Sequence, residues 1–186
     1  KTRIGFNKSE IETWIPALLK AEPAAIILHG RTRKEMSKAP AHWNLIGQAA
    51  KIVKRSGRQT LIIGNGDVTS LADAEQKAKR YGLDGVMVGR GIFANPWFFN
   101  PAINPFEIKP EEKIALLIKH LKLFDKTWGK TKNFNIMKKF FKIYISGPRF
   151  QRDPANGGGW DGAKNLRTKL METKTVKEAL KRLLSC

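Results

Sequence analysis

The stretch TLIIGNGDVTSLADAEQKAKRYGLDGVMVGRG, from Thr60 to Gly91, decides the fold predicted for this chain. It contains two apolar runs, LII and GVMV, separated by an amphipathic segment. Ser70 stands before that segment as a helix N-cap, and Gly82 stands after it, where a glycine commonly ends a helix. We therefore predict a strand, a helix and a second strand, which is the repeating unit of a parallel α/β sheet.

The same alternation extends back to the first residues. Lys1 to Ile4 is typical of the end of a strand, AAIILHG (residues 24–30) predicts a buried strand, and residues 43–54 predict a helix. In SEIETWIPALLKA (residues 9–21), Ser9 and Glu12 form a capping box, and Pro16 is expected to kink this helix or shift its start. The strands are solid apolar runs, which predicts burial on both faces.

Polar residues follow the predicted strands at their carboxyl ends. They are His29-Gly30-Arg31, Asn65-Gly66-Asp67 and Gly89-Arg90. A doubly wound sheet would give the same alternation, but it binds ligands mainly at one switch point. A (β/α)₈ barrel builds its site from the ends of consecutive strands. We therefore predict an α/β fold consisting of the C-terminal half of a (β/α)₈ TIM barrel.

Beyond about Pro105 the pattern predicts helices alone. Pro110 suits the first turn of a helix, with two glutamates after it, and Thr175 with Glu178 forms a capping box. Further helices are predicted near residues 134–146 and 162–171, and the Gly- and Pro-rich stretch 146–162 is predicted to be a surface loop. We therefore expect residues 1–104 to form the partial barrel and residues 105–186 a small all-α helical bundle.

The charge of the chain points to an anionic partner. Its 186 residues include 35 Lys and Arg against 16 Asp and Glu, a net charge of +19. Nucleic acid is the partner we favour, and an anionic membrane surface is the alternative. A single Cys and the lack of a long apolar run fit a soluble protein of the cytoplasm. Three scattered histidines predict no metal site.

Each strand-end motif has a functional and a structural interpretation. Asn65-Gly66-Asp67 can contact a polar ligand or form an ordinary turn. Gly89 and Arg90 can bind a phosphate, or Arg90 can make a surface ion pair. His29 can be a structural hydrogen-bonding group, and Lys1 can point into the barrel mouth or lie frayed in solvent.

The motifs KTRIG, LHGRTR, GNGD, GVMVGRGIFANPWFF and MKKFFKIYISG, followed by AKNLRTKLM, occur in an order that resembles the tRNA-dihydrouridine synthase family. The resemblance implies a barrel that binds FMN, followed by a helical domain that helps to hold tRNA. It implies reduction of the C5=C6 bond of selected uridines, with NADPH as the reductant. The chain starts at Lys1 without Met, so we expect a fragment that lacks the first half of the barrel and, with it, the family's catalytic Cys.

The resemblance also implies roles for individual residues. Lys1 and His29 correspond to residues at the flavin ring. Asn65, Gly66 and Asp67 correspond to the ribityl phosphate side, and Gly89 and Arg90 to the phosphate grip. Arg31 and Arg33 would face the RNA. A cationic Lys1 or His29 would stabilise an anionic reduced flavin.

A lysine cluster in the second predicted helix of the bundle, Lys138, Lys139 and Lys142, is a candidate tRNA contact, or else a solvated helix face. Two rival functions stay open from the residues alone. One is an FMN-dependent barrel oxidoreductase acting on a small molecule, which does not explain the charge. The other is a basic RNA-binding protein without catalysis. The oligomeric state and the modified tRNA position do not follow from the sequence.

Overall fold

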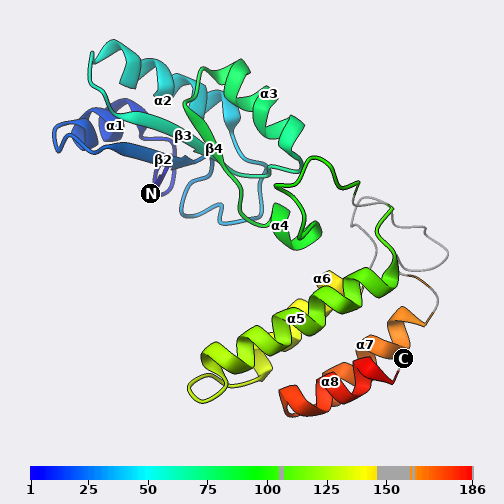
Figure 1. The fold of residues 1–186 in the computed structure, drawn as a ribbon. Helices are drawn as coiled ribbons and strands as arrows, with labels where there is room; N and C mark the ends of the chain where they lie inside the picture. Colours follow the sequence, from blue (N-terminus) through cyan, green and yellow to red (C-terminus); the bar gives the residue numbers. More distant parts are fainter. Residues whose placement is uncertain (105–106, 146–159, 161, 186) are drawn as a thin grey trace. The chain divides into compact units, whose positions relative to one another are not determined.

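The structure is a computed structural model that describes residues 1–104, 107–145, 160 and 162–185. The chain divides into two compact units, Lys1–Ile92 and Phe93–Cys186. The first unit contains a parallel sheet and the second is formed by helices (Figure 1). The assignment of residues 1–104 to a cofactor domain and 105–186 to a tRNA-binding domain stays a prediction.

The first unit is a four-stranded parallel sheet with helices between its strands. The strands are β1 (Thr2–Arg3), β2 (Ala25–His29), β3 (Leu61–Asn65) and β4 (Gly85–Met87), in the order β1-β2-β3-β4. The helices are α1 (Ile11–Leu19), α2 (Trp43–Arg55) and α3 (Leu71–Tyr81), and a short α4 (Gly91–Ala94) follows β4. Figure 1 shows α1, α2 and α3 on one side of the sheet. The predicted parallel α/β order is therefore confirmed.

The two faces of the sheet differ in burial. Ile26 and Leu28 of β2 and Ile62 of β3 are buried, and they share the face on which Gly64 meets α2. Ile27 and Ile63 lie on the other face and are only partly buried. The prediction of burial on both faces is therefore wrong for this chain, because α1, α2 and α3 cover a single face.

The predicted ends of α3 are confirmed, whereas the predicted start of α1 is wrong. Ser70 Oγ accepts a hydrogen bond from Asp73 N (3.0 Å), and Gly82 ends α3 in the left-handed conformation (φ 64°). Helix α1 begins at Ile11 with Glu10 as its N-cap residue, and Pro16 lies inside it. Glu10 N donates to Ile4 O (2.8 Å), so the chain is still bonded to the residue that follows β1 after it passes Ser9.

The second unit consists of α5 (Pro110–Trp128), α6 (Asn135–Tyr144), α7 (Ala163–Glu172) and α8 (Val176–Leu184). These helices share an apolar core that includes Leu117, Leu121, Met137, Phe141, Leu170 and Leu183. Pro110 opens α5 and Thr175 Oγ1 accepts from Glu178 N (3.2 Å), as predicted. Most of the predicted loop at 146–162 lies outside the described residues, as does Cys186. No helix within the described ranges has the length and apolarity needed to cross a bilayer.

Candidate functional site

The carboxyl ends of the four strands bring one row of residues together. The parallel register aligns Arg3 with His29, His29 with Asn65, and Asn65 with Met87. Residues paired in a parallel sheet project from the same face, so these side chains share the face opposite α1, α2 and α3. Lys1 lies two residues before Arg3 and therefore joins this face. Sites in parallel α/β folds lie at this edge.

Asn65 connects the first strand to the last. Lys1 Nζ donates to Asn65 Oδ1 (2.7 Å), and Asn65 Nδ2 donates to the backbone oxygen of Met87 (2.8 Å). Burial, followed by the nearby charge of Arg3, lowers the pKa of Lys1 below its ordinary value. Lys1 is thus held at the strand ends by a hydrogen bond to a residue 64 positions away.

His29 is surrounded by positive charge. Burial lowers its pKa to about 4, and the charges of Arg3, Lys1 and Arg31 lower it in the same direction. Its imidazole is therefore neutral at neutral pH. Arg31 Nη1, which can only donate, lies 3.3 Å from His29 Nε2, so Nε2 accepts and the proton sits on Nδ1. His29 is thus a neutral hydrogen-bond donor at Nδ1. It is not the cation that the sequence analysis considered as a stabiliser of a reduced flavin.

Asp67 links three segments through its carboxylate. Oδ2 pairs with the Arg31 guanidinium and accepts from Ala41 N (2.9 Å), while Oδ1 lies 3.3 Å from Arg90 Nη2. Burial alone would raise the pKa of Asp67, but the hydrogen bonds from Arg31 and Ala41 and the charges of Arg31 and Arg90 outweigh it and hold the pKa below its ordinary value. Asp67 is therefore an ionised anchor for two arginines.

The two arginines that Asp67 pairs differ in exposure. The Arg31 side chain is 4% exposed, and its Nε also donates to Ala39 O. The Arg90 side chain is 65% exposed. Arg31 is therefore fixed inside the loop that follows β2, whereas Arg90 is open to solvent on the side away from Asp67.

Two glycines shape the backbone at the strand ends. Gly66 has φ 131°, and a Cβ placed there would lie 2.6 Å from Ala41 Cβ. Its carbonyl accepts from Trp43 Nε1 (3.0 Å), which fixes the turn on α2. A Cβ on Gly89 would meet no atom within 4 Å, so the backbone there is open to a ligand. Gly66 thus allows the turn after β3 to pack closely against Ala41, and Gly89 leaves its backbone accessible.

The strand-end cluster carries an excess of positive charge. Lys1, Arg3, Arg31 and Arg90 supply four cationic side chains against the single carboxylate of Asp67. Such a set can bind an anion such as a phosphate. Within the described ranges, no group of three or more His, Cys, Asp or Glu side chains could hold a metal ion.

Most of the sequence-predicted cofactor residues meet in this cluster. Lys1 bonds to Asn65, and His29, Asp67 and Arg90 are linked through Arg31. The register of β2 and β3 sets His29 beside Asn65, and Gly66 and Gly89 lie in the adjoining turns.

Sequence reasoning missed two members of the cluster. One is Arg3, whose Nη1 donates to Thr32 O (2.9 Å). The other is the backbone N–H of Ala41, which binds Asp67. Strand alternation places Arg3 on the same face as Lys1, but the sequence analysis assigned it no role in the site. No sequence signal marks a backbone N–H.

The residues predicted to contact RNA fall into different environments. Arg31 is buried, so it offers RNA no surface, whereas Arg33 is exposed. In α6, Lys138 Nζ donates to Met171 O (2.7 Å) at the end of α7, which ties the two helices together. Lys139 is exposed, with its Nζ 4.9 Å from the centre of the Phe140 ring.

The sequence matches the family model described as dihydrouridine synthase over residues 1–186. The chain belongs to the dihydrouridine synthase family. The strand-end cluster is therefore a feature of a dihydrouridine synthase chain, and the resemblance found from the sequence motifs is confirmed.

Relatives from three bacteria match nearly all of this dihydrouridine synthase chain. A probable tRNA-dihydrouridine synthase of Staphylococcus epidermidis is 37% identical over 181 residues, and one of Staphylococcus aureus is 38% identical over 181 residues. The probable tRNA-dihydrouridine synthase 2 of Bacillus subtilis is 37% identical over 180 residues. Each alignment covers 96% of this chain and 51% of the relative. The chain thus spans about half the length of the curated relatives it matches.

Proposed function

We propose that this chain is part of an enzyme that reduces uridine to 5,6-dihydrouridine in tRNA, with FMN as cofactor and NADPH as reductant. The observation that carries the proposal is the cationic cluster at the ends of four consecutive parallel strands, in a chain of the dihydrouridine synthase family. The net charge of +19 supports an RNA substrate over a small molecule.

The first unit is proposed to be the second half of a (β/α)₈ barrel. Its strands follow one another in sequence order, whereas a doubly wound sheet reverses its order at a switch point. Its helices lie on one side of the sheet, as they do around a barrel (Figure 1). In a complete barrel, the partly buried face with Ile27 and Ile63 would line the interior.

The strand-end residues fit an anionic flavin nucleotide. Arg90 is exposed and held by Asp67, and Gly89 leaves its backbone accessible, so these two residues would hold the phosphate. Lys1 and Asn65 would bind the polar edge of the ring system, and Gly66 would shape the turn on the ribityl phosphate side. When bound, the flavin supplies a hydride to C6 of uracil.

The remaining residues of the cluster position these groups. His29 holds its proton at Nδ1 and would donate a hydrogen bond there without adding charge. Lys1 and Arg3 supply the positive charge that favours a reduced, anionic cofactor. Arg31 and Asp67 form a fixed pair that orients Arg90, so we assign Arg31 a positioning role and leave Arg33 as the candidate RNA contact.

The helical region 105–186 is proposed to bind tRNA through its basic surface. Lys139 and Lys142 are exposed on α6 and would contact phosphates, while Lys138 also stabilises the packing of α6 on α7. The acid that protonates C5 is proposed to be a Cys outside this chain. The chain alone is therefore expected to be inactive.

The test is an assay of the complete protein that contains this chain. We expect it to purify yellow and to form dihydrouridine in tRNA when NADPH is present, and to form little without NADPH. Activity on a free uracil compound in place of tRNA would support the small-molecule rival. A colourless protein that binds tRNA would support the non-catalytic rival.

A pair of variants links the flavin to the strand ends. Arg90→Gln should lose bound flavin, because the charge-assisted contact to phosphate is removed. Lys177→Gln, an exposed lysine of α8, is the matched control and should retain it. Equal flavin content in both variants would contradict the proposed phosphate site.

A further inference from the structure

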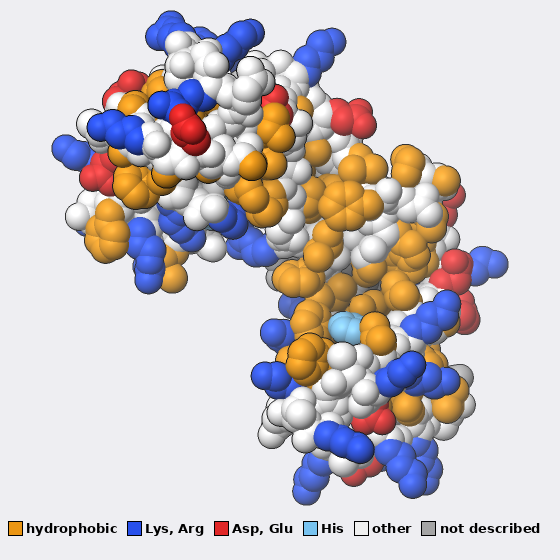
Figure 2. Space-filling view, turned by 60° about the vertical axis from the view of Figure 1, so that its left-hand side comes forward, with side chains coloured by type: hydrophobic (Ala, Val, Ile, Leu, Met, Phe, Trp, Pro, Cys, Tyr) orange, Lys and Arg blue, Asp and Glu red, His pale blue; other side chains and the backbone are white. Residues whose placement is uncertain are grey.

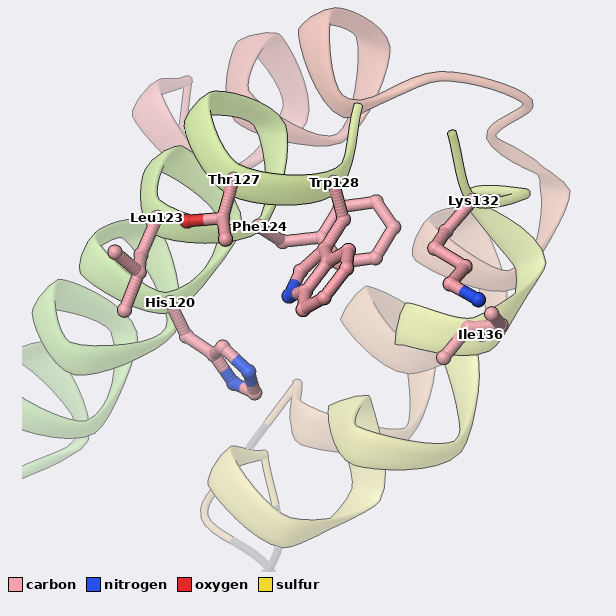
Figure 3. Close-up of a pocket in the computed structure, with 7 residues that line it drawn as sticks. All are labelled: His120, Leu123, Phe124, Thr127, Trp128, Lys132 and Ile136. Atoms are coloured by element: carbon pink, nitrogen blue, oxygen red, sulfur yellow. The ribbon is translucent and has the colours of Figure 1, made fainter. Parts of the chain in front are cut away.

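A pocket of about 400 Å³ opens between α5 and α6 in the helical unit. Figure 3 shows the Trp128 indole in its centre, with His120 on one side and Lys132 and Ile136 on the other. Leu123, Phe124 and Thr127 complete its lining. The volume lies at the low end of the roughly 300–1,000 Å³ common for small-molecule sites.

The pocket presents apolar surface that the helical core does not use. Trp128 is 50% exposed, Leu123 61% and Ile136 41%. The neighbouring Phe124 is buried in the core and supports the pocket from below. Figure 2 shows hydrophobic side chains gathered around a partly exposed histidine on the helical unit, with Lys and Arg side chains around them. The indole of Trp128 is thus exposed to solvent on a surface that is otherwise cationic.

The position of Lys132 is fixed by the turn after α5. Lys132 N donates to Trp128 O (2.8 Å), and Lys132 Nζ lies 5.8 Å from the centre of the Trp128 ring. The ammonium therefore lies over one face of the Trp128 ring, from where it can reach a phosphate attached to a base stacked on the other face. His120 and Thr127 contribute polar side chains to the lining. His120 Nδ1 lies 2.9 Å from Tyr144 Oη, which orients the imidazole.

The charge around the pocket selects the kind of occupant. Between Lys119 and Lys142 the sequence has eight lysines and one acidic residue, Asp125, a difference of +7. A second copy of this chain, at +19, would be repelled. A flat ring that carries a negative charge on a short linker matches both the aromatic face and the adjacent ammonium.

We propose that this pocket binds one unpaired nucleotide of the RNA substrate, with its base stacked on Trp128 and its phosphate paired with Lys132. This inference rests on the proposed function and names a second contact on the RNA, separate from the uridine to be reduced. Unpaired bases expose their π-faces, whereas paired bases hide them in the helix. The pocket therefore lets the helical unit distinguish loops from duplex RNA.

The experiment uses the complete protein and two synthetic RNAs, a short unpaired oligonucleotide and a blunt duplex. Trp128→Ala should weaken binding of the unpaired RNA about ten- to hundredfold, as expected for the loss of one base stack, with little effect on the duplex. Trp128→Phe keeps an aromatic face and should recover most of the affinity. Leu184→Ala, which removes another exposed apolar side chain, is the matched control and should change neither RNA.

Lys132→Gln should reduce the slope of log affinity against log salt by about 0.7 for the unpaired RNA. Lys177→Gln, at an exposed position outside the pocket, is the control and should leave this slope unchanged. Circular dichroism checks that each variant is folded. We expect each to fold, because Trp128 and Lys132 are exposed.

Three results would overturn the inference. The first is a Trp128→Ala variant that binds both RNAs as the wild type does, or that loses both equally. The second is equal quenching by acrylamide of the tryptophan fluorescence of the wild type and of Trp128→Phe. That result would mean that another part of the protein covers Trp128. The third is an acidic peptide that competes with the unpaired RNA and whose binding is weakened by Trp128→Ala as much as RNA binding is. Dihydrouridine formation, measured separately, decides the proposed function, since its absence in the wild type rejects that function whatever the pocket binds.

Discussion

Replacing Asp67 by Asn removes one negative charge from the strand-end cluster while keeping the shape of the side chain. Asp67 holds Arg31 and the N–H of Ala41 through Oδ2 and reaches Arg90 through Oδ1. An amide can keep one acceptor oxygen toward Arg31, but its NH₂ group then faces Arg90, and two donors do not bond. We therefore expect a less stable protein in which Arg90 is released.

The size of the effect follows from the exposure of each partner. A hydrogen bond to a charged group contributes about 1.5–3 kcal/mol, and Asp67 is 36% exposed, so the lower end applies to its bond with the buried Arg31. A neutral acceptor retains roughly half of this. The ion pair with the exposed Arg90 contributes about 0–1 kcal/mol. The sum predicts that Asp67→Asn lowers the free energy of unfolding by about 1–2 kcal/mol.

The assay is urea unfolding of the complete protein, repeated at decreasing pH. The pKa of Asp67 is depressed, so its contribution to stability is complete above the ordinary value of 3.8 and is lost as the pH falls through the lower, folded value. The difference between wild type and Asp67→Asn should therefore shrink below pH 3.8. Asp125→Asn, at an exposed position of α5, is the control and should change stability by less than about 0.5 kcal/mol. A difference that is absent at neutral pH, or constant at every pH, would refute the anchoring role of Asp67.

Three further predictions concern the first unit. Gly64→Ala should destabilise it by about 1–3 kcal/mol in urea unfolding, because a Cβ would lie 2.7 Å from Trp43 and 2.8 Å from Leu83; an unchanged midpoint would mean that these side chains move freely. Ser70→Ala should cost about 1 kcal/mol through loss of the α3 cap, whereas Ser70→Asp should retain most of the stability, and equal losses would contradict the cap. The imidazole of His29 should titrate near pH 4 by NMR, so its contribution to stability should fall as the pH drops from 6.5 toward 4; titration near 6.5 would contradict both the burial of the ring and the effect of the surrounding positive charge.

Local chemistry made several features of this protein predictable from the sequence. The parallel order of strands and helices follows from apolar runs and amphipathic segments, and the ends of α3 follow from Ser70 and Gly82. The start of α1 was mispredicted, since a hydrogen bond from Glu10 to Ile4 competes with the capping pattern at Ser9. Signals within one turn of chain are sufficient where no distant partner interferes.

The sequence by itself also determined which residue types gather at the strand ends, because parallel strands of known direction place their carboxyl ends together. Only the tertiary structure decided which of those side chains are buried and bonded within the protein and which are exposed to solvent. Arg31 and Arg33 belong to one motif, yet Arg31 is buried against Asp67, 36 residues away, while Arg33 is exposed. The carboxylate that fixes Arg31 follows a different strand, and the contact forms only once β2 and β3 pair and bring their carboxyl ends together.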